Sequence, residues 1–144
     1  QAWLSYAGGI LATKDYADAT SQAMPTEEAI LATNPDIIFI GGTYATKEYA
    51  DLLNNEMWQN IAAVKKGNIF IEPTGATAWN ACSTNYPLLV YYCFSCMYPE
   101  RVDFDLQEMA HDFYLKYYEI DFSVEHLELM FQSKAPDGTE MWVE

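Results

Sequence analysis

The chain has 144 residues, of which 51% are hydrophobic and 19% are charged, proportions typical of one folded domain and not of a disordered segment. Seven Lys and Arg residues against 21 Asp and Glu residues give a formal charge of −14, so we expect neither nucleic acid nor an anionic lipid surface as a partner. No apolar run is long enough to span a membrane, and residues 1–15 lack the pattern of a signal peptide. Because Gln1 is not an initiator methionine and the sequence opens in mid-pattern, we expect the chain to be a fragment of a longer protein.

The first half of the chain alternates between helical and strand patterns. Its clearest signal is the run Ile37-Ile38-Phe39-Ile40, which is typical of a parallel strand buried on both faces. The surrounding residues predict a helix that ends at Gly8-Gly9, a short helix over 27–32 after an N-cap at Thr26, a helix over 47–53, a helical turn over 58–62 and a second strand over 69–71.

The second half is predicted to be mainly helical. A loop rich in turn formers covers 73–80, and helices are expected over 86–98, over 105–118 and from Ser123 to Phe131. Strands that alternate with helices predict an α/β fold, a Rossmann-like unit with a short parallel sheet flanked by helices. Ligands of such sheets lie beyond the carboxyl ends of the strands, which makes the loops 41–46 and 72–80 the candidate binding loops.

The sequence gives little support for redox, catalytic or metal-binding chemistry. The three cysteines are Cys82, Cys93 and Cys96, and the C-x-x-C pair lies inside an apolar helix, where thiols act as small hydrophobic residues. A small flavodoxin-like redox protein or enzyme that uses this pair or the strand-end loops is the alternative function, but no nucleotide-binding or nucleophile motif supports it. His111 and His126 stand alone, so we expect no metal site, no cofactor and no catalytic residue.

Five segments in co-linear order over about residues 5 to 131 carry a family resemblance. They are Ala-Gly-Gly-Ile at 7–10, Thr-Glu-Glu-Ala-Ile-Leu-Ala-Thr-Asn-Pro-Asp-Ile-Ile-Phe-Ile at 26–40, Met-Trp-Gln-Asn-Ile-Ala-Ala-Val-Lys-Lys-Gly-Asn-Ile-Phe at 57–70, Met-Tyr-Pro-Glu at 97–100 and Phe-Tyr-Leu-Lys-Tyr-Tyr at 113–118. Together they resemble the substrate-binding proteins of ATP-binding-cassette (ABC) importers for iron siderophores, haem and vitamin B12.

The resemblance implies a binding function outside the cytoplasm and no catalysis. Members of that family have two α/β lobes with the ligand between them, and this chain resembles the C-terminal lobe only, with residues 1–133 forming the lobe and residues 134–144 a tail. The implied partners are a metal-chelate or corrinoid ligand, the permease of an ABC transporter and a missing N-terminal lobe. The implied location is the periplasm or, for a lipoprotein, the outer side of the cell membrane. A lobe that acts alone as an interaction domain remains a further alternative.

The resemblance also assigns roles to individual residues. Glu28 holds the place of the acid that docks the lobe onto the permease, and the alternative is an ordinary acid at the start of a helix. Trp79 lies where relatives carry a ligand contact, flanked by Thr77 and Asn80, and the alternative is a tryptophan folded back on the core. Thr43 and Tyr44, in the loop after the first strand, are the remaining ligand-contact candidates.

Overall fold

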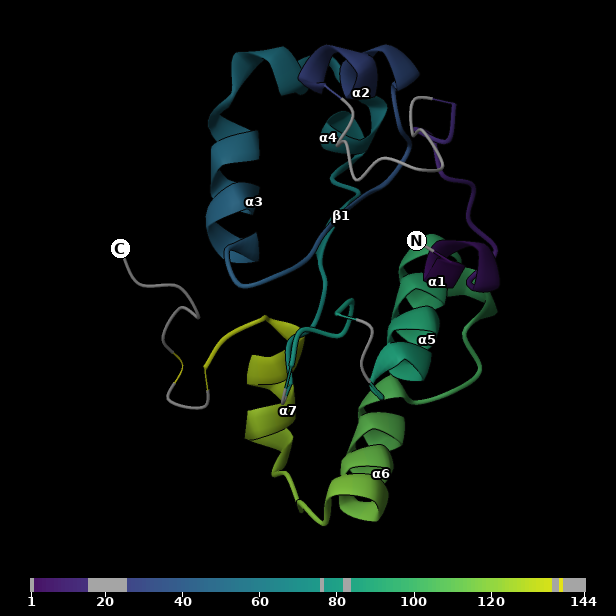
Figure 1. Ribbon diagram of the computed structural model, residues 1–144, viewed down its shortest axis with the longest axis vertical. Coiled ribbons are helices and arrows are strands. Elements are labelled where there is room, and N and C mark those ends of the chain that lie inside the picture. Colours follow the sequence, from purple (N-terminus) through teal and green to yellow (C-terminus); the bar gives the residue numbers. More distant parts are fainter. Residues whose placement is uncertain (1, 16–25, 76, 82–83, 136–137, 139–144) are drawn as a thin grey trace.

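Two short parallel strands form the sheet of the computed structural model, which describes residues 2–15, 26–75, 77–81, 84–135 and 138. Strand β1 (Ile38–Ile40) pairs with β2 (Ile69–Ile71), with Phe39 opposite Phe70 in the register. Both strands consist of isoleucine and phenylalanine, whose branched or aromatic side chains pack well on a pleated surface. The parallel pairing confirms the predicted α/β fold class, and helices flank the strands (Figure 1).

In the described part of the first half, the helical segments are α1 (Ala2–Tyr6), α2 (Glu27–Thr33), α3 (Ala45–Asn54), the 3-10 helix η1 (Glu56–Asn60) and α4 (Ala62–Lys66). The Thr26 side chain accepts a hydrogen bond from the Ala29 amide and begins α2, as predicted. The helical turn expected over 58–62 divides instead into η1 and α4. Gly67 ends α4 at a φ of 70°, a left-handed conformation that glycine adopts without strain.

The described residues of the second half form the helices α5 (Tyr86–Met97), α6 (Leu106–Tyr118) and α7 (Val124–Phe131) and the short 3-10 helix η2 (Pro99–Arg101). The carboxylate of Asp105 accepts hydrogen bonds from the Gln107 and Glu108 amides and caps α6. Ser123 caps α7 in the same way. These local caps explain why the predicted starts of α2, α6 and α7 agree with the structure to within one residue, whereas α3, which has no side-chain cap, begins two residues before its predicted start.

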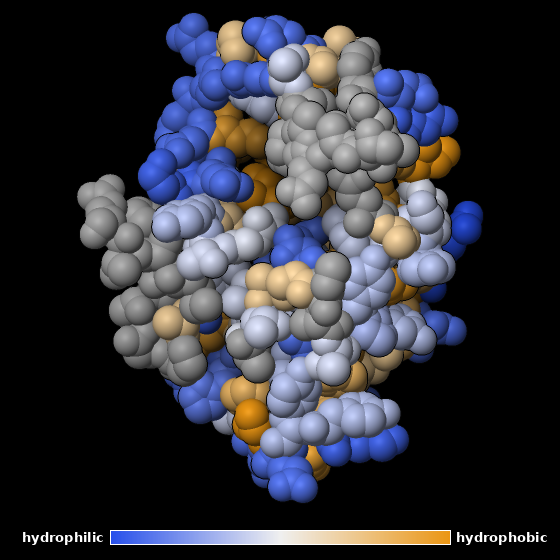
Figure 2. Space-filling view, viewed as in Figure 1, coloured by the Kyte–Doolittle hydropathy of each residue, from blue (hydrophilic) through white to orange (hydrophobic). Residues whose placement is uncertain are grey.

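Buried side chains form two clusters of different size. The smaller cluster joins the sheet to α3 and contains Ile40, Ala45 and Ile69. The larger lies among α1, α5, α6 and α7 and includes Trp79, Leu89, Cys93, Tyr114, Leu127 and Met130. On the face shown in Figure 2, hydrophobic residues appear in small groups between hydrophilic ones. Within the described ranges, each helix is too short or too polar to cross a membrane.

Candidate functional site

The two strands end side by side, and the chain continues from them into the predicted binding loops. Gly41 follows β1 directly, and Glu72 follows β2. The Glu72 amide donates a hydrogen bond of 2.8 Å to the Ile40 carbonyl, so the pairing extends one residue past β2. This places the side chain of Glu72 at the carboxyl edge of the sheet, where ligands of open α/β sheets bind.

Three residues meet at this edge and form what we call the strand-end cluster: Gly41, Glu72 and Asn80. A methyl group built on Gly41 would lie 1.9 Å from Oε2 of Glu72 and 2.2 Å from Nδ2 of Asn80. Both side chains therefore press directly against the backbone of Gly41, at distances that only a glycine allows without movement. Glu72 is not among the residues predicted from the sequence, although an acid that directly follows an apolar strand is a usable signal.

The carboxyl group of Glu72 is unusually placed for an acid. The residue is 3% exposed, and its Oε2 atom has no hydrogen-bond partner among the described residues. Burial raises the pKa of Glu72 from 4.5 to about 7, and the hydrogen bond with Asn80 opposes this rise. Because desolvation disfavours the charged form, the neutral acid is well populated near neutral pH.

Helix α5 places three more titratable groups behind β2. The Tyr92 hydroxyl donates a hydrogen bond of 2.6 Å to the Ile71 carbonyl. Burial raises the pKa of Tyr92 and of Cys93, and the nearby charge of Glu72 contributes to both shifts. Burial also raises the pKa of Cys96 to about 11. Both thiols are therefore protonated at neutral pH, which supports a packing role for the C-x-x-C pair. Cys82 lies outside the described residues.

Trp79 lies in the core and not on the ligand-facing surface. Its side chain has 0% exposure, its indole N–H donates a hydrogen bond of 3.1 Å to the Tyr114 hydroxyl, and its ring meets Phe131 edge-on at 5.6 Å between centroids. A side chain without exposed surface cannot contact a ligand in this conformation. The expectation of a ligand contact at Trp79 is therefore corrected to the alternative, a tryptophan folded back on the core.

The other expected ligand residues lie at or near the strand ends. Asn80 belongs to the strand-end cluster. Thr43 is exposed, and Tyr44, 55% exposed, stands at the N-cap of α3 without a side-chain capping hydrogen bond. Thr77 is exposed as well, and its hydroxyl accepts a hydrogen bond of 3.5 Å from the Asn85 amide group. Their roles in ligand binding stay predictions.

The two acids at the start of α2 have different surroundings. Glu27 accepts a hydrogen bond of 3.2 Å from the Asn55 side chain and another from the Trp58 indole N–H. Glu28 is exposed. Because α2 precedes β1, whereas the binding loops follow the strands, α2 with its residue Glu28 lies toward the end of the sheet opposite the strand-end cluster, and Figure 1 shows the position of this helix.

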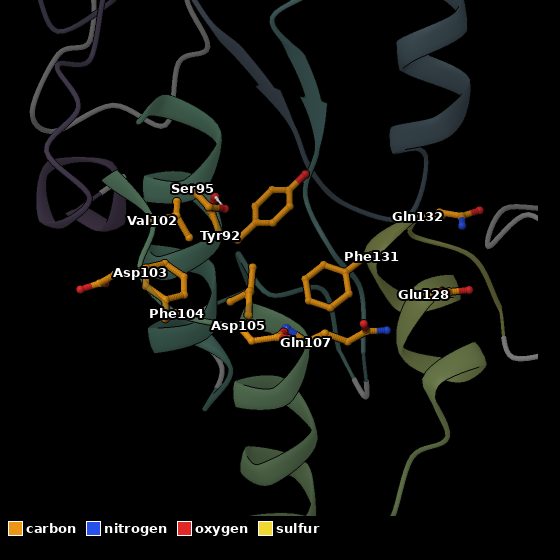
Figure 3. Close-up of a pocket in the computed structure, with 11 residues that line it drawn as sticks. Tyr92, Ser95, Val102, Asp103, Phe104, Asp105, Gln107, Glu128, Phe131 and Gln132 are labelled. Atoms are coloured by element: carbon orange, nitrogen blue, oxygen red, sulfur yellow. Dashed lines mark hydrogen bonds between the residues drawn. The ribbon is translucent and has the colours of Figure 1, made fainter. Parts of the chain in front are cut away.

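One groove lies away from the expected ligand residues. It measures about 760 Å³ and lies between the end of α5, the start of α6 and α7, with Tyr92, Phe104 and Phe131 among the residues that line it (Figure 3). A second groove of about 460 Å³ runs between β1 and α3 and reaches Gly41. The described residues contain no group of three metal-ligating side chains, and His111 is bonded to Asp121 and Asp112 on the surface.

The sequence and the fold agree with a known family of proteins. A family model described as periplasmic binding protein matches residues 3–74, half of the chain. The chain belongs to the periplasmic binding protein family. Its relatives include the molybdate-binding protein MolA of Haemophilus influenzae, which is 32% identical over 98 residues, a match that covers 63% of this chain and 26% of MolA.

Solved structures of periplasmic binding proteins share the fold. An ABC transporter solute-binding protein from Sulfurospirillum deleyianum has a TM-score of 0.78 at 21% identity and covers 90% of this chain and 40% of its own. A periplasmic solute-binding protein from Veillonella parvula has a TM-score of 0.75 at 23% identity, with coverages of 99% and 44%. MolA bound to molybdate has a TM-score of 0.69 at 27% identity, with coverages of 85% and 37%.

The match confirms the family resemblance drawn from the sequence, and it shows molybdate as a ligand of one relative. The chain spans less than half the length of the relatives that it matches. Family membership places this periplasmic binding protein outside the cytoplasm, as expected. These relatives are solute-binding proteins, and the ligand named for MolA is molybdate.

Proposed function

We propose that the chain is part of the substrate-binding component of an ABC importer, which captures a ligand outside the cytoplasm and delivers it to the membrane permease. We further propose that the ligand is a small oxyanion of the molybdate type. The observation that carries this proposal is the set of neutral hydrogen-bond donors on the strand-end loops, in a chain 32% identical over 98 residues to a molybdate-binding protein.

Neutral donors suit an oxyanion because each can donate to an anionic oxygen without requiring a buried countercharge. The loops offer the hydroxyl groups of Thr43, Tyr44 and Thr77 and the amide of Asn80. Helix α3 begins immediately after Tyr44, so the positive end of its dipole adds to the same attraction. Such local donors are needed because the formal charge of −14 repels a free anion from most of the surface.

A metal chelate, haem or a cobamide is the second candidate ligand. The side chain of Tyr44 favours it, because an aromatic ring that is 55% exposed at the binding loop offers a flat apolar surface to a macrocycle or a catecholate. An oxyanion makes little use of that ring beyond its hydroxyl group.

Titration calorimetry on the full-length protein separates these ligands. Molybdate, sulfate, a ferric siderophore and cobalamin are titrated in turn, first into the wild type and then into Thr43→Val and Tyr44→Phe. We expect molybdate to bind, and each variant to lose about five- to tenfold in affinity, as the loss of one hydrogen bond implies. Binding of cobalamin or the siderophore without molybdate would instead establish the second candidate.

We also propose that Glu28 docks the protein onto the permease. Its exposure on α2, the helix that precedes β1 and not the loops that follow the strands, supports this role, and a carboxylate meets an arginine of a partner in a charge-assisted, bidentate contact. Its neighbour Glu27 is held by two hydrogen bonds within the chain, so it provides a matched acid with a structural role.

A further inference from the structure

The strand-end cluster contains a carboxyl group, that of Glu72, beside the loops that we propose to bind an anion. Glu72 is only 3% exposed. Its side chain lies against Gly41, the first residue of the loop that leads to Thr43 and Tyr44. Its second neighbour in the cluster, Asn80, is one of the proposed donors. An ionised carboxylate here would oppose the binding of any anion on these loops.

Burial dominates the electrostatics of Glu72, and the opposing positive charge that acts on its carboxyl group does not cancel this effect. Among the described residues it forms no salt bridge, and its Oε2 atom accepts no hydrogen bond. The groups that face it from α5 are the Tyr92 hydroxyl, which donates to the Ile71 carbonyl, and the Cys93 thiol. Burial raises the pKa of both groups, so both stay neutral at physiological pH and add no positive charge.

We propose that Glu72 is a specificity-determining residue that admits an anionic ligand to the strand-end site only while its carboxyl group carries a proton. This inference rests on the proposed oxyanion function. The protonated side chain keeps its contacts with Gly41 and Asn80 and removes the repulsion, and its O–H becomes an additional donor in the cluster. Binding of the anion and binding of the proton then favour each other, as linked equilibria require.

Two properties of Glu72 agree with this role. Burial already raises its pKa to about 7, so the protonated form needs little further stabilisation at neutral pH. An anion bound nearby raises the pKa again, because a like charge disfavours ionisation. Each bound oxyanion should therefore take up close to one proton when the protein starts above pH 7.

The test is the pH dependence of molybdate affinity in the full-length protein, measured by calorimetry between pH 6 and pH 9, where molybdate remains a dianion. We expect the wild-type affinity to fall by up to tenfold per pH unit above about pH 7, the limit for uptake of one proton. Glu72→Gln keeps a neutral side chain of the same shape and should give a flat profile. Glu48→Gln, which removes an exposed carboxylate beside the second groove, is the matched control and should keep the wild-type slope.

A second measurement does not depend on the variant. Wild-type titrations at pH 8 in two buffers of different ionisation enthalpy give the number of protons taken up per molybdate, and we expect a value near one. A value near zero, or the same slope in Glu72→Gln as in the wild type, would overturn the inference and leave the oxyanion function intact. Absence of molybdate binding at every pH would overturn both.

Discussion

Replacement of Trp79 by alanine is expected to destabilise the fold and not to act on a ligand. The side chain is completely buried, its ring packs edge-on against Phe131, and its N–H donates to Tyr114. Truncation of a buried tryptophan to alanine typically costs about 3–5 kcal/mol. The buried hydroxyl also loses a hydrogen-bond donor, worth about 1 kcal/mol. Since native domains are stable by only about 5–15 kcal/mol, this one change removes a large share of the total.

The free energy of unfolding is measured by urea denaturation, monitored by circular dichroism. Ligand affinity is measured without urea, at a temperature where the variant is folded. Trp79→Phe is included because it preserves most of the ring and should cost less, by the lost hydrogen bond and a partial cavity. Tyr44→Ala is the matched exposed aromatic. It should change stability by no more than about 0.5 kcal/mol, as most surface substitutions do, while it weakens binding if Tyr44 contacts the ligand.

The reverse pattern would refute this reasoning. If Trp79→Ala unfolds at the same urea concentration as the wild type and loses ligand affinity instead, the indole must leave the core when ligand is present. The packing seen among α6, α7 and the 72–80 loop would then describe only the ligand-free arrangement.

Three further predictions concern single residues. Glu28→Arg should leave ligand affinity unchanged and abolish uptake by the reconstituted importer, and normal uptake by this variant would exclude the docking role. Glu27→Ala, which loses two hydrogen bonds within the chain, should lower stability by about 1 kcal/mol and permit uptake. Gly41→Ala should lower the free energy of unfolding by about 1–3 kcal/mol, and with it the urea midpoint, because the new methyl group overlaps the side chains of Glu72 and Asn80. An unchanged midpoint would mean that these side chains move aside freely. The hydrogen bond to Asp121 and, to a smaller extent, the one to Asp112 raise the pKa of His111 above 6.5. The stabilisation of the fold by His111 should therefore be complete below pH 6.5 and disappear as the pH rises through the native pKa. Nuclear magnetic resonance titration of the ring, with His111→Gln as the stability control, checks this, and an ordinary ring pKa would contradict it.

The elements that the sequence predicts well are those whose cause is local. Thr26, Asp105 and Ser123 cap helices through hydrogen bonds to amides two or three residues away, so neighbouring residues are sufficient to locate the helix starts. The strands Ile38–Ile40 and Ile69–Ile71 stand out because a continuous apolar run short enough for a strand is itself a local pattern.

The site was harder to predict because its properties depend on residues that are distant in the sequence. Trp79 lies in a loop rich in turn formers, and only the fold shows that Tyr114 of α6 closes over it. Glu72 resembles any acid at the end of a strand until pairing with β1 brings it against Gly41. Glu27 and Glu28 are adjacent on α2, but helical geometry directs only one of them toward Trp58.

Glu72→Gln should stabilise the fold above neutral pH, and this prediction needs no ligand. The native pKa of about 7 exceeds the ordinary value of 4.5, so between these values the native state binds more protons than the unfolded state. Stability therefore falls as the pH rises from about 4.5 to 7 and then levels off, by an amount of about 3 kcal/mol at most. The glutamine side chain has no charge to bury, so this loss should be absent from the variant.

The comparison consists of urea denaturation of wild type and Glu72→Gln at pH 5 and pH 8. The difference in unfolding free energy between the two proteins should shift in favour of the variant by about 2–3 kcal/mol from pH 5 to pH 8. Glu48→Gln, an exposed acid on α3, should show no such shift. Equal pH dependence in wild type and Glu72→Gln would mean that the carboxyl group titrates near its ordinary value, because water or a cation reaches it, and the burial of Glu72 would then not set its charge.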